Sequence, residues 1–391
     1  MPAALYALAI ADGKGRRQPT TAGPTELPTK TEHTMRTKKV LITGGAGFVG
    51  CNAARYFGSR NWHVTVLDNL SRQGTDANLH WLRDGTTFDF ELADVRDKEA
   101  MDRSISANRY DAVIHLAAQV AVTTSVIDPR SDFMVNALGT FNVLDAVRRF
   151  SPHAVVVFAS TNKVYGKIAG APTELKGTRH AYVDRPFGIS ESEPLDFLSP
   201  YGCSKGAADQ YALDFARIYG IPATSFRQSC IYGTRQFGVE DQGWVAWFAI
   251  ASLLGRDITI FGDGKQVRDV LHVDDLLRAY EAAILAPDRI AGQAFNVGGG
   301  PSQVISLLDL IAMLERKLGR KIPLKWQDWR PGDQRAYVSD IRKLETALGW
   351  KPEIPVDQGI AQLLDWVDEN RALFAPASEP ASEPAARVAA N

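Results

Sequence analysis

The chain has 391 residues, of which 45% are hydrophobic and 23% are charged, and its formal net charge is -1. This length suffices for two domains, or for one large nucleotide-binding unit with a smaller lobe. Because the net charge is close to zero and no basic block occurs, the sequence does not favour nucleic acid or an anionic membrane surface as a partner. No apolar run reaches the ~20 residues that span a bilayer, so no membrane association is predicted.

The three cysteines of the chain, Cys51, Cys203 and Cys230, show no paired spacing. This pattern favours reduced thiols in a cytoplasmic protein over a disulfide framework or a zinc site. We therefore predict a cytoplasmic location and no bound metal.

Both ends of the chain are predicted to be disordered extensions. Residues 1–34 begin with a mildly apolar stretch that lacks a basic n-region, which argues against a signal peptide. Residues 375–391 repeat Ala-Ser-Glu-Pro and have low complexity. Neither segment is assigned a function.

Between these ends, short β-branched runs alternate with longer amphipathic stretches. The runs Val40–Thr43, His63–Leu67, Ala112–Leu116 and Ala154–Ala159 are too short for helices, and amphipathic segments such as Ala137–Phe150 follow them. This alternation is typical of an α/β fold with a doubly wound parallel sheet and helices on both faces. Ligands of such sheets bind at the carboxyl ends of the strands.

The first predicted strand runs into a glycine-rich turn at residues 44–50, with the letters GGAGFVG. Gly44 permits the tight turn, Gly47 lets the backbone approach a pyrophosphate, and Gly50 lets the next helix pack closely on the strand. Phe48 and Val49 open that helix, whose N-terminus faces the phosphate charge. The turn therefore predicts a dinucleotide site.

Acidic residues after the next two strands indicate which dinucleotide binds. Asp68 ends the second strand, followed by Asn69, and a carboxylate there accepts hydrogen bonds from ribose hydroxyls and repels a 2′-phosphate. This favours NAD over NADP, with a simple turn aspartate as the alternative interpretation. Arg72 is close enough to weaken the preference, although a solvated arginine is the favoured interpretation. Asp94 and Val95 follow a third β-like segment, where adenine contacts are expected.

Tyr201 and Lys205 are spaced four residues apart after Pro200, so they share one face of the predicted helix. A phenol with a pKa near 10 is a weak base at neutral pH, and an adjacent ammonium brings that pKa toward the working range. Thr161 follows the preceding strand, where its hydroxyl can hold a substrate hydroxyl in line with the phenolate. These residues predict an acid–base pair for carbinol oxidation.

Over about residues 36–370 the chain resembles the extended short-chain dehydrogenase/reductase superfamily, in its nucleotide-sugar epimerase/dehydratase branch. Besides the turn and Asp68, the matching positions are His115-Leu116-Ala117-Ala118, Asn136 with Gly139-Thr140, Thr161 with Tyr165-Gly166, Tyr201 with Lys205, Tyr232-Gly233, Arg268-Asp269 with His272-Val273-Asp274-Asp275, and Asn296-Val297-Gly298.

The resemblance implies a Rossmann domain over residues 35–230, with its sheet completed by parts of 255–300. A smaller C-terminal lobe, mainly residues 231–374, would bind substrate. It also implies a homo-oligomer, either a dimer or a tetramer, and NAD as the cofactor.

The resemblance also implies roles for individual residues. Thr161, Tyr201 and Lys205 would form the catalytic triad, with Asn136 supporting the proton path behind the lysine. Arg268 would bind the substrate diphosphate, for which a bidentate guanidinium is suited. Further contacts to NAD are expected at Leu116, Ala117, Ala118, Tyr201 and Lys205.

The residues after Thr161 indicate the reaction. Sugar 4,6-dehydratases carry Thr-Asp-Glu here, whereas this chain has Asn162 and Lys163 after the threonine, so the acid pair for water elimination is missing. This stretch and residues 200–210, 236–244 and 329–335 resemble the CDP-paratose 2-epimerase group. That resemblance implies inversion of C2 of a CDP-dideoxyhexose through a transient ketone, with Asn162, Lys163 and Arg330 touching substrate.

Several alternatives stay open. The chain could instead be a C4 epimerase of a UDP- or other nucleotide sugar, or a non-catalytic NAD-binding protein, although such proteins usually lack the Tyr/Lys pair. Lys163 could be a solvated lysine. The Pro- and Gly-rich segment 166–200 is long enough for a lid. Trp326, Trp329 and Trp350 are candidate pocket walls, and a place in the core is the favoured prediction for them.

Overall fold

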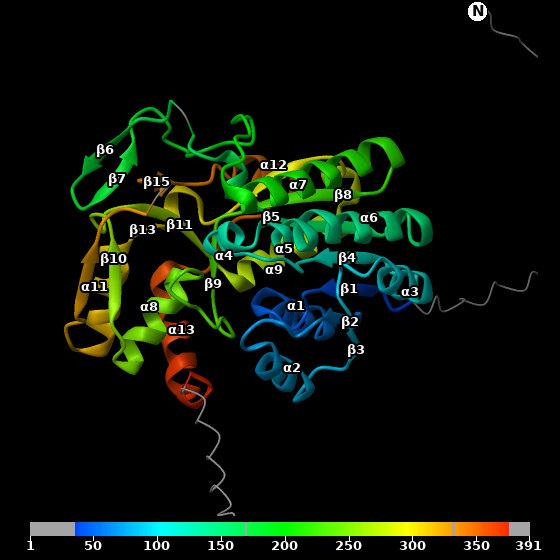
Figure 1. The fold of residues 1–391 in the computed structure, drawn as a ribbon, viewed down its shortest axis with the longest axis horizontal. Helices are drawn as coiled ribbons and strands as arrows, with labels where there is room; N and C mark the ends of the chain where they lie inside the picture. Colours follow the sequence, from blue (N-terminus) through cyan, green and yellow to red (C-terminus); the bar gives the residue numbers. More distant parts are fainter. Residues whose placement is uncertain (1–35, 169, 331–332, 375–391) are drawn as a thin grey trace, which may run out of the picture. The chain divides into compact units, whose positions relative to one another are not determined.

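The computed structural model of the protein describes residues 36–168, 170–330 and 333–374. The segments predicted to be disordered, 1–34 and 375–391, lie outside the described residues, and the domain boundaries stay predictions. The described residues from Thr37 onward belong to one unit, and Figure 1 shows their elements in chain order.

A seven-stranded parallel sheet forms the centre, in the order β12-β8-β5-β4-β1-β2-β3. Its strands are β1 (Lys39–Thr43), β2 (His63–Asp68), β3 (Phe88–Leu92), β4 (Ala112–His115), β5 (Val155–Thr161), β8 (Ala223–Gln228) and β12 (Ala294–Val297). This arrangement confirms the predicted α/β class. The chain order reverses between β1 and β4, and the ligand of a doubly wound sheet binds at such a reversal.

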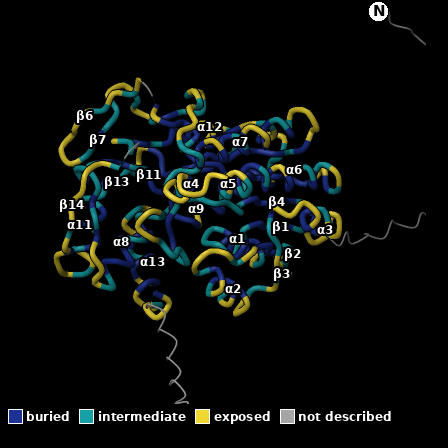
Figure 2. The backbone as a smooth tube through the Cα atoms, in the orientation of Figure 1, coloured by how far each residue is buried: buried dark blue, intermediate teal, exposed yellow. Residues whose placement is uncertain are grey.

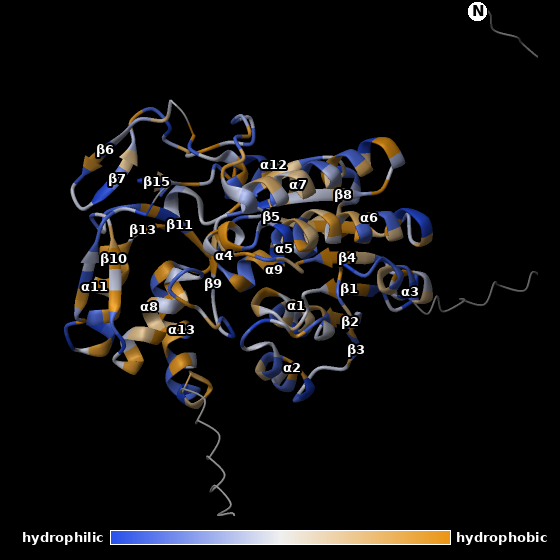
Figure 3. Ribbon diagram, viewed as in Figure 1, coloured by the Kyte–Doolittle hydropathy of each residue, from blue (hydrophilic) through white to orange (hydrophobic). Residues whose placement is uncertain are grey.

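The inner strands are buried because helices cover both faces of the sheet. Every residue of β4 is buried, and Figures 2 and 3 show β1 and β4 as buried and hydrophobic. The structure shifts some predicted ends. The run predicted over 154–159 forms β5, which continues to Thr161, and the run predicted to end at Leu116 stops at His115.

Two groups of helices pack on the sheet and make two separate cores. One group is α1 (Phe48–Gly58), α2 (Thr75–Arg83) and α9 (Val273–Leu285). The other is α3 (Lys98–Asn108), α6 (Gly139–Phe150) and α7 (Ser199–Tyr219). Short helices α4 (Val122–Ile127) and α5 (Pro129–Phe133) and a π-helical turn (Met134–Leu138) pack against α7. The helix predicted over 137–150 is therefore a π turn followed by α6.

The later part of the chain builds a third core beside the sheet. Its helices are α8 (Trp244–Leu254), α11 (Leu307–Leu318) and α13 (Val356–Glu369). Its strands are β9 (Cys230–Tyr232), β10 (Ile258–Phe261), β11 (Val267–His272), β13 (Val304–Ser306) and β14 (Leu324–Gln327). Strand β15 (Ala336–Tyr337) pairs with β11. The remaining helices are α10 (Pro287–Ile290) and α12 (Arg342–Leu348), and three short 3-10 turns span Asn162–Tyr165, Gly300–Gln303 and Arg371–Phe374.

The segment predicted as a possible lid contains an antiparallel hairpin, β6 (Thr173–Lys176) with β7 (Arg179–Tyr182). The hairpin is tied to the C-terminal part of the chain, because the Tyr182 hydroxyl donates to the Ala336 carbonyl at 2.8 Å. Among the described helices, none is long and apolar enough to cross a membrane.

Candidate active site

A cavity of about 610 Å³ lies at the carboxyl edge of the sheet, within the size range of small-molecule sites. Residues of the glycine turn, the ends of β2, β4 and β5, the start of α7 and segment 228–245 line it together. The cavity therefore brings the predicted cofactor and catalytic residues to one place, although they are spread over about 160 positions of sequence.

The turn between β1 and α1 has the geometry that a pyrophosphate requires. Gly44 has φ +68°, and a Cβ there would meet the Ala117 nitrogen at 2.7 Å. A Cβ on Gly50 would lie 2.2 Å from the Gly44 carbonyl oxygen. Helix α1 has no side-chain cap and no acidic residue in its first turn, and Gly47, Phe48 and Val49 line the cavity. The first N–H groups of α1 are thus available to an anion.

Asp68 lies at the adenosine end, held by the backbone. Its Oδ2 accepts from the Ala46 N–H at 3.0 Å and its Oδ1 from the Leu70 N–H at 2.8 Å. Burial raises the pKa of this carboxyl, against the effect of these hydrogen bonds. The carboxylate lines the cavity with lone pairs that ribose hydroxyls can use. This cradle fits a dinucleotide without a 2′-phosphate.

Asn69, Asp94 and Val95 line the same end of the cavity. The Asn69 side-chain nitrogen donates to Asp94 Oδ2 at 2.7 Å. Two hydrogen bonds from the Arg96 guanidinium help to lower the pKa of Asp94 to about 2, so this carboxylate is ionised. The three residues lie where the adenine contacts were predicted.

The segment after β4 forms the facing wall, where Leu116, Ala117 and Ala118 line the cavity. Asn136 does not line it. Instead, Asn136 Oδ1 accepts from the Gln119 N–H at 2.9 Å and Nδ2 donates to the Gln119 carbonyl at 3.0 Å, and Gln119 is a lining residue. Asn136 therefore holds this wall from behind, and its predicted part in a proton path stays a prediction.

Thr161, Tyr201 and Lys205 converge where β5 ends and α7 begins. Thr161 is the last residue of β5, and Tyr201 lies in the first turn of α7. All three line the cavity and are at most 8% exposed. The Lys205 ammonium donates to the Ala159 carbonyl at 2.6 Å and lies 4.2 Å from the centre of the Phe158 ring. The tyrosine and lysine thus face the cavity from the same side of one helix.

Burial acts in opposite directions on the two titratable groups. It raises the pKa of Tyr201 to about 12, although a hydrogen bond with Thr161 partly offsets the rise. It lowers the pKa of Lys205 to about 7, against the attraction of Asp209 and Asp132. Low-dielectric surroundings disfavour both charged forms, and a cation bound beside the pair would favour the phenolate. This pair could move a proton if a positively charged dinucleotide occupied the cavity.

Of the predicted substrate residues, Thr161 lines the cavity, whereas Asn162, Lys163, Arg268 and Arg330 do not. Arg268 and Lys163 form a cluster beside it. Arg268 donates to Asp333 at 2.7 Å and to the Gln334 carbonyl at 2.8 Å. Burial and the charge of Arg268 lower the pKa of Lys163, whereas Asp333 raises it. Cys230, which does line the cavity, also feels the charges of Arg268 and Lys163. The cluster therefore adjoins the cavity at Cys230.

Arg330 and Asn162 are also engaged within the protein. Arg330 pairs with Asp241 at 3.1 Å and lies 3.9 Å from the centre of the Phe261 ring. Asn162 is buried and accepts from the Thr161 hydroxyl at 3.4 Å. Part of the 329–335 stretch, residues 331–332, lies outside the described residues.

The prediction for the tryptophans was correct for only one of them. Trp350 is buried, and its indole N–H donates to the Asp275 carbonyl at 2.9 Å. Trp326 is 54% exposed and Trp329 is 37% exposed. The core prediction was therefore wrong for these two, because they lie on β14, at the edge of a two-stranded sheet, and in the loop after it.

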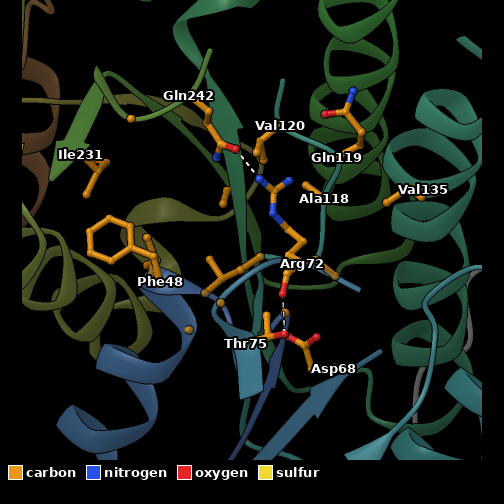
Figure 4. A pocket seen from close by; sticks show the side chains of 18 of the residues that line it. Phe48, Asp68, Arg72, Thr75, Ala118, Gln119, Val120, Val135, Ile231 and Gln242 are labelled. Carbon is orange, nitrogen blue, oxygen red and sulfur yellow. Dashed lines mark hydrogen bonds between the residues drawn. The ribbon is translucent and has the colours of Figure 1, made fainter. Parts of the chain in front are cut away.

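Segment 228–245 supplies lining residues that the sequence did not identify, among them Gln242. Figure 4 shows Arg72 reaching across the pocket to Gln242, to whose side-chain oxygen it donates a hydrogen bond. The solvated arginine of the sequence interpretation is thus a cavity residue. The fingerprint spacing around Asp68 could have suggested Arg72, but nothing near Arg72 in sequence points to a partner 170 residues later.

Comparison with known proteins gives the same picture as the geometry. The NAD dependent epimerase/dehydratase family matches residues 40–298. A CDP-paratose 2-epimerase of Salmonella typhi is 44% identical over 84% of this chain and 98% of that protein. A putative UDP-glucose 4-epimerase of Methanocaldococcus jannaschii is 32% identical over 85% of this chain and 99% of its own length.

Among solved structures, a UDP-glucose 4-epimerase of Thermus thermophilus in complex with NAD has a TM-score of 0.70 and 32% identity. The match covers 84% of this chain and 98% of that one. The chain belongs to the NAD dependent epimerase/dehydratase family, and its cofactor is NAD.

Proposed function

We propose that this member of the NAD dependent epimerase/dehydratase family inverts C2 of a CDP-dideoxyhexose, in the manner of a CDP-paratose to CDP-tyvelose conversion. The observation that carries the proposal is the convergence of Thr161, Tyr201 and Lys205 in the cavity that the glycine turn also lines. The likeness to the Salmonella typhi enzyme supports the choice of sugar and base.

In the proposed reaction the buried phenol is the acid–base. Tyr201 takes the proton of the C2 hydroxyl as that carbon becomes a ketone, and it returns the proton after the sugar has turned over. Thr161 orients the hydroxyl, and the Lys205 ammonium stabilises the phenolate. Bound NAD supplies the hydride acceptor and donor, so that no net oxidation occurs.

The sugar must turn while the rest of the substrate stays fixed, and we assign that fixing to Asn162, Lys163, Arg268 and Arg330. Guanidinium groups suit a diphosphate because they donate two parallel hydrogen bonds. Binding energy from this remote handle positions the sugar in both orientations. Asp333 and Asp241 pair with the two guanidiniums, and a diphosphate would compete with these carboxylates.

A second candidate is C4 epimerisation of a UDP- or other nucleotide sugar. The likeness to the putative UDP-glucose 4-epimerase and to the Thermus thermophilus structure favours it. A non-catalytic NAD-binding protein is the remote alternative, against which the intact Tyr201 and Lys205 pair stands.

Isotope labelling tests these alternatives on the purified protein with CDP- and UDP-sugars. We expect turnover in D2O to leave the inverted carbon free of deuterium, because the hydride never exchanges with water. A substrate deuterated at C2 should keep its label and show a primary isotope effect. Solvent deuterium at the inverted carbon would contradict the oxidation route, and an isotope effect at C4 instead would establish the second candidate.

We also propose a homo-oligomer, either a dimer or a tetramer. Large apolar side chains are exposed on neighbouring helices α5, α6 and α7, among them Phe133, Phe141, Tyr211 and Ile218. The rings of Phe141 and Tyr211 pack edge to face, and exposed apolar surface that spans neighbouring helices is typical of a protein interface. The mass in solution, measured by light scattering, tests the proposal.

The three unpaired thiols, Cys51, Cys203 and Cys230, support a further proposal that the protein acts in the cytoplasm. Fractionation of cells followed by an epimerase assay tests this location.

A further inference from the structure

A buried carboxylate that the proposed chemistry does not use lies beside the catalytic helix. Asp132 of α5 has no exposed surface. Its Oδ2 accepts from the Ser204 hydroxyl at 2.5 Å and its Oδ1 from the Asn136 side chain at 3.2 Å. Ser204 stands between Tyr201 and Lys205 in the first turns of α7. Asp132 is therefore joined by one side chain to the turn that carries the acid–base pair.

Asp132 has no close cationic partner of its own. Within the described parts of the chain, no arginine, lysine or histidine forms an ion pair with it, and Lys205 is the cation whose charge acts on its carboxyl. Burial raises the pKa of Asp132, and the Ser204 hydroxyl and Lys205 act to lower it. A buried charge without a direct partner is unfavourable. The ammonium and this carboxylate thus stabilise each other across Ser204.

The other carboxylate near Lys205 is compensated differently. Asp209, one turn further along α7, forms a two-pronged ion pair with Arg227 of β8 at 2.9 and 3.1 Å. Its Oδ2 also accepts from the hydroxyls of Ser160, at 2.7 Å, and Ser225, at 2.5 Å. Asp209 acts on Lys205 more strongly than Asp132 does, but Asp209 is paired with Arg227, and Asp132 is the carboxylate that acts on Tyr201 as well as on Lys205.

Two further titratable groups near Tyr201 and Lys205, His115 and Arg72, do not add a negative charge. His115 of β4 is neutral, because burial and the charge of Lys205 lower its pKa to about 3. Arg72, in the loop after β2, faces Tyr201 from across the cavity and stabilises the phenolate. Asp132 on α5 thus adds the one negative charge that acts on Tyr201 and Lys205 together.

We propose that Asp132 is a positioning residue of the acid–base pair. Through Ser204 it fixes the first turns of α7, and its charge sets the pH range over which Tyr201 and Lys205 work. This inference rests on the proposed epimerase function for its kinetic test.

The sign of the effect follows from the charges. A carboxylate disfavours the nearby phenolate and favours the nearby ammonium, so it raises the pKa of Tyr201 and the pKa of Lys205 alike. The two groups titrate as a coupled pair, and the two limbs of a bell-shaped pH profile report that pair. Removing the charge should move both limbs to lower pH. Loss of packing alone would lower the plateau and leave the limbs in place.

The test is the pH dependence of kcat for the NAD-bound full chain, measured for Asp132→Asn. Asparagine can still accept from Ser204, so the fold should survive. We expect both limbs to move down by about half a unit to one unit. Ser204→Ala, which removes the hydrogen bond and keeps the carboxylate, should lower the plateau and leave the limbs within about 0.2 units, since a neutral hydroxyl exerts a weaker field than a charge. Asp128→Asn, at the exposed cap of α5, should change neither.

Unmoved limbs in Asp132→Asn, or limbs that move in opposite directions, would overturn the proposal. Asp132→Glu keeps the charge, and a shift in this variant as large as that of Asp132→Asn would overturn it as well. If Asp132→Asn fails to fold, Asp132→Ser is the second variant, because its smaller side chain keeps a hydroxyl and removes the charge. Both limbs of its pH profile should likewise move to lower pH.

A second readout is independent of the substrate. The difference in ultraviolet phenolate absorbance between proteins with Tyr201 and with Tyr201→Phe reports the titration of this one phenol. Its midpoint should be lower in the Asp132→Asn background, whichever sugar is the substrate. An inactive native protein would refute the proposed function, whereas an unchanged midpoint would refute the role of Asp132.

Discussion

The cofactor end and the proposed substrate end of the site are held in opposite ways. At the cofactor end, residues 44–50 present backbone N–H groups, and Asp68 is fixed by the N–H groups of Ala46, in the glycine turn, and of Leu70, two residues later. At the substrate end, Arg268 and Arg330 are long side chains held by carboxylates, in segments that the fold brings together. The geometry of the first end is fixed by local backbone, whereas that of the second depends on ion pairs with which a bound diphosphate would compete.

Removal of the proposed acid–base pair should have the largest effect. Tyr201→Phe takes away the positioned acid–base, so turnover should fall at least ~10²-fold. Folding and NAD content should be kept, because the phenyl ring still fills its place in the cavity wall. The measurements are turnover and the NAD released on denaturation. Tyr211→Phe alters an exposed tyrosine of the same helix and should leave turnover unchanged. Near-native turnover of Tyr201→Phe would exclude Tyr201 from the mechanism.

Substitutions at two glycines of the cofactor end should distinguish an effect on NAD binding from an effect on folding. Gly47 has φ −69°, and a Cβ there would lie 3.1 Å from the Gly44 oxygen. Gly47→Ala should therefore fold normally but weaken NAD retention at least about tenfold, because the pyrophosphate can no longer approach its N–H groups. Gly50→Ala should in addition lower stability by about 1–3 kcal/mol, since its Cβ would overlap the Gly44 carbonyl.

Thermal unfolding of the cofactor-stripped proteins, beside their NAD content, checks both glycine variants. Equal losses of stability in Gly47→Ala and Gly50→Ala would contradict the separate roles of the two positions.

Substitutions at the ion-paired end should act mainly on KM. Arg330→Ala should raise KM for the nucleotide sugar about tenfold, because it removes one hydrogen bond to a charged group. Asp241→Asn should lower KM a few fold, because it frees Arg330 from a partly exposed ion pair.

Asp257→Asn breaks an exposed pair with Lys325 and is the control for these KM measurements. A KM that is the same in all three variants would mean that Arg330 does not touch substrate. Opposite shifts in Arg330→Ala and Asp241→Asn would show that the carboxylate and the diphosphate compete for one guanidinium.

The sequence predicted the local parts of the molecule well. The glycine turn, Asp68 and the Tyr201/Lys205 spacing each lie within one turn or one strand end, where short-range geometry decides which atoms face the ligand. The same holds for the four strands, whose burial on both faces requires continuous apolar runs. Only their ends moved, at Thr161 and His115, because hydrogen bonding to neighbouring strands decides where a strand stops.

Chain order alone did not reveal contacts across long separations. Arg72 reaches Gln242, Arg330 pairs with Asp241, and Asp132 meets Ser204, each over tens to hundreds of residues. Trp326 and Trp329 look like core residues by type, and their exposure follows from the edge position of β14. The sequence predicted the cofactor and the proposed acid–base pair because backbone turns and helix spacing encode both locally. The tertiary structure decided which buried charges face that pair, because only folding brings α5 against α7 in low-dielectric surroundings, where one carboxylate acts on both groups.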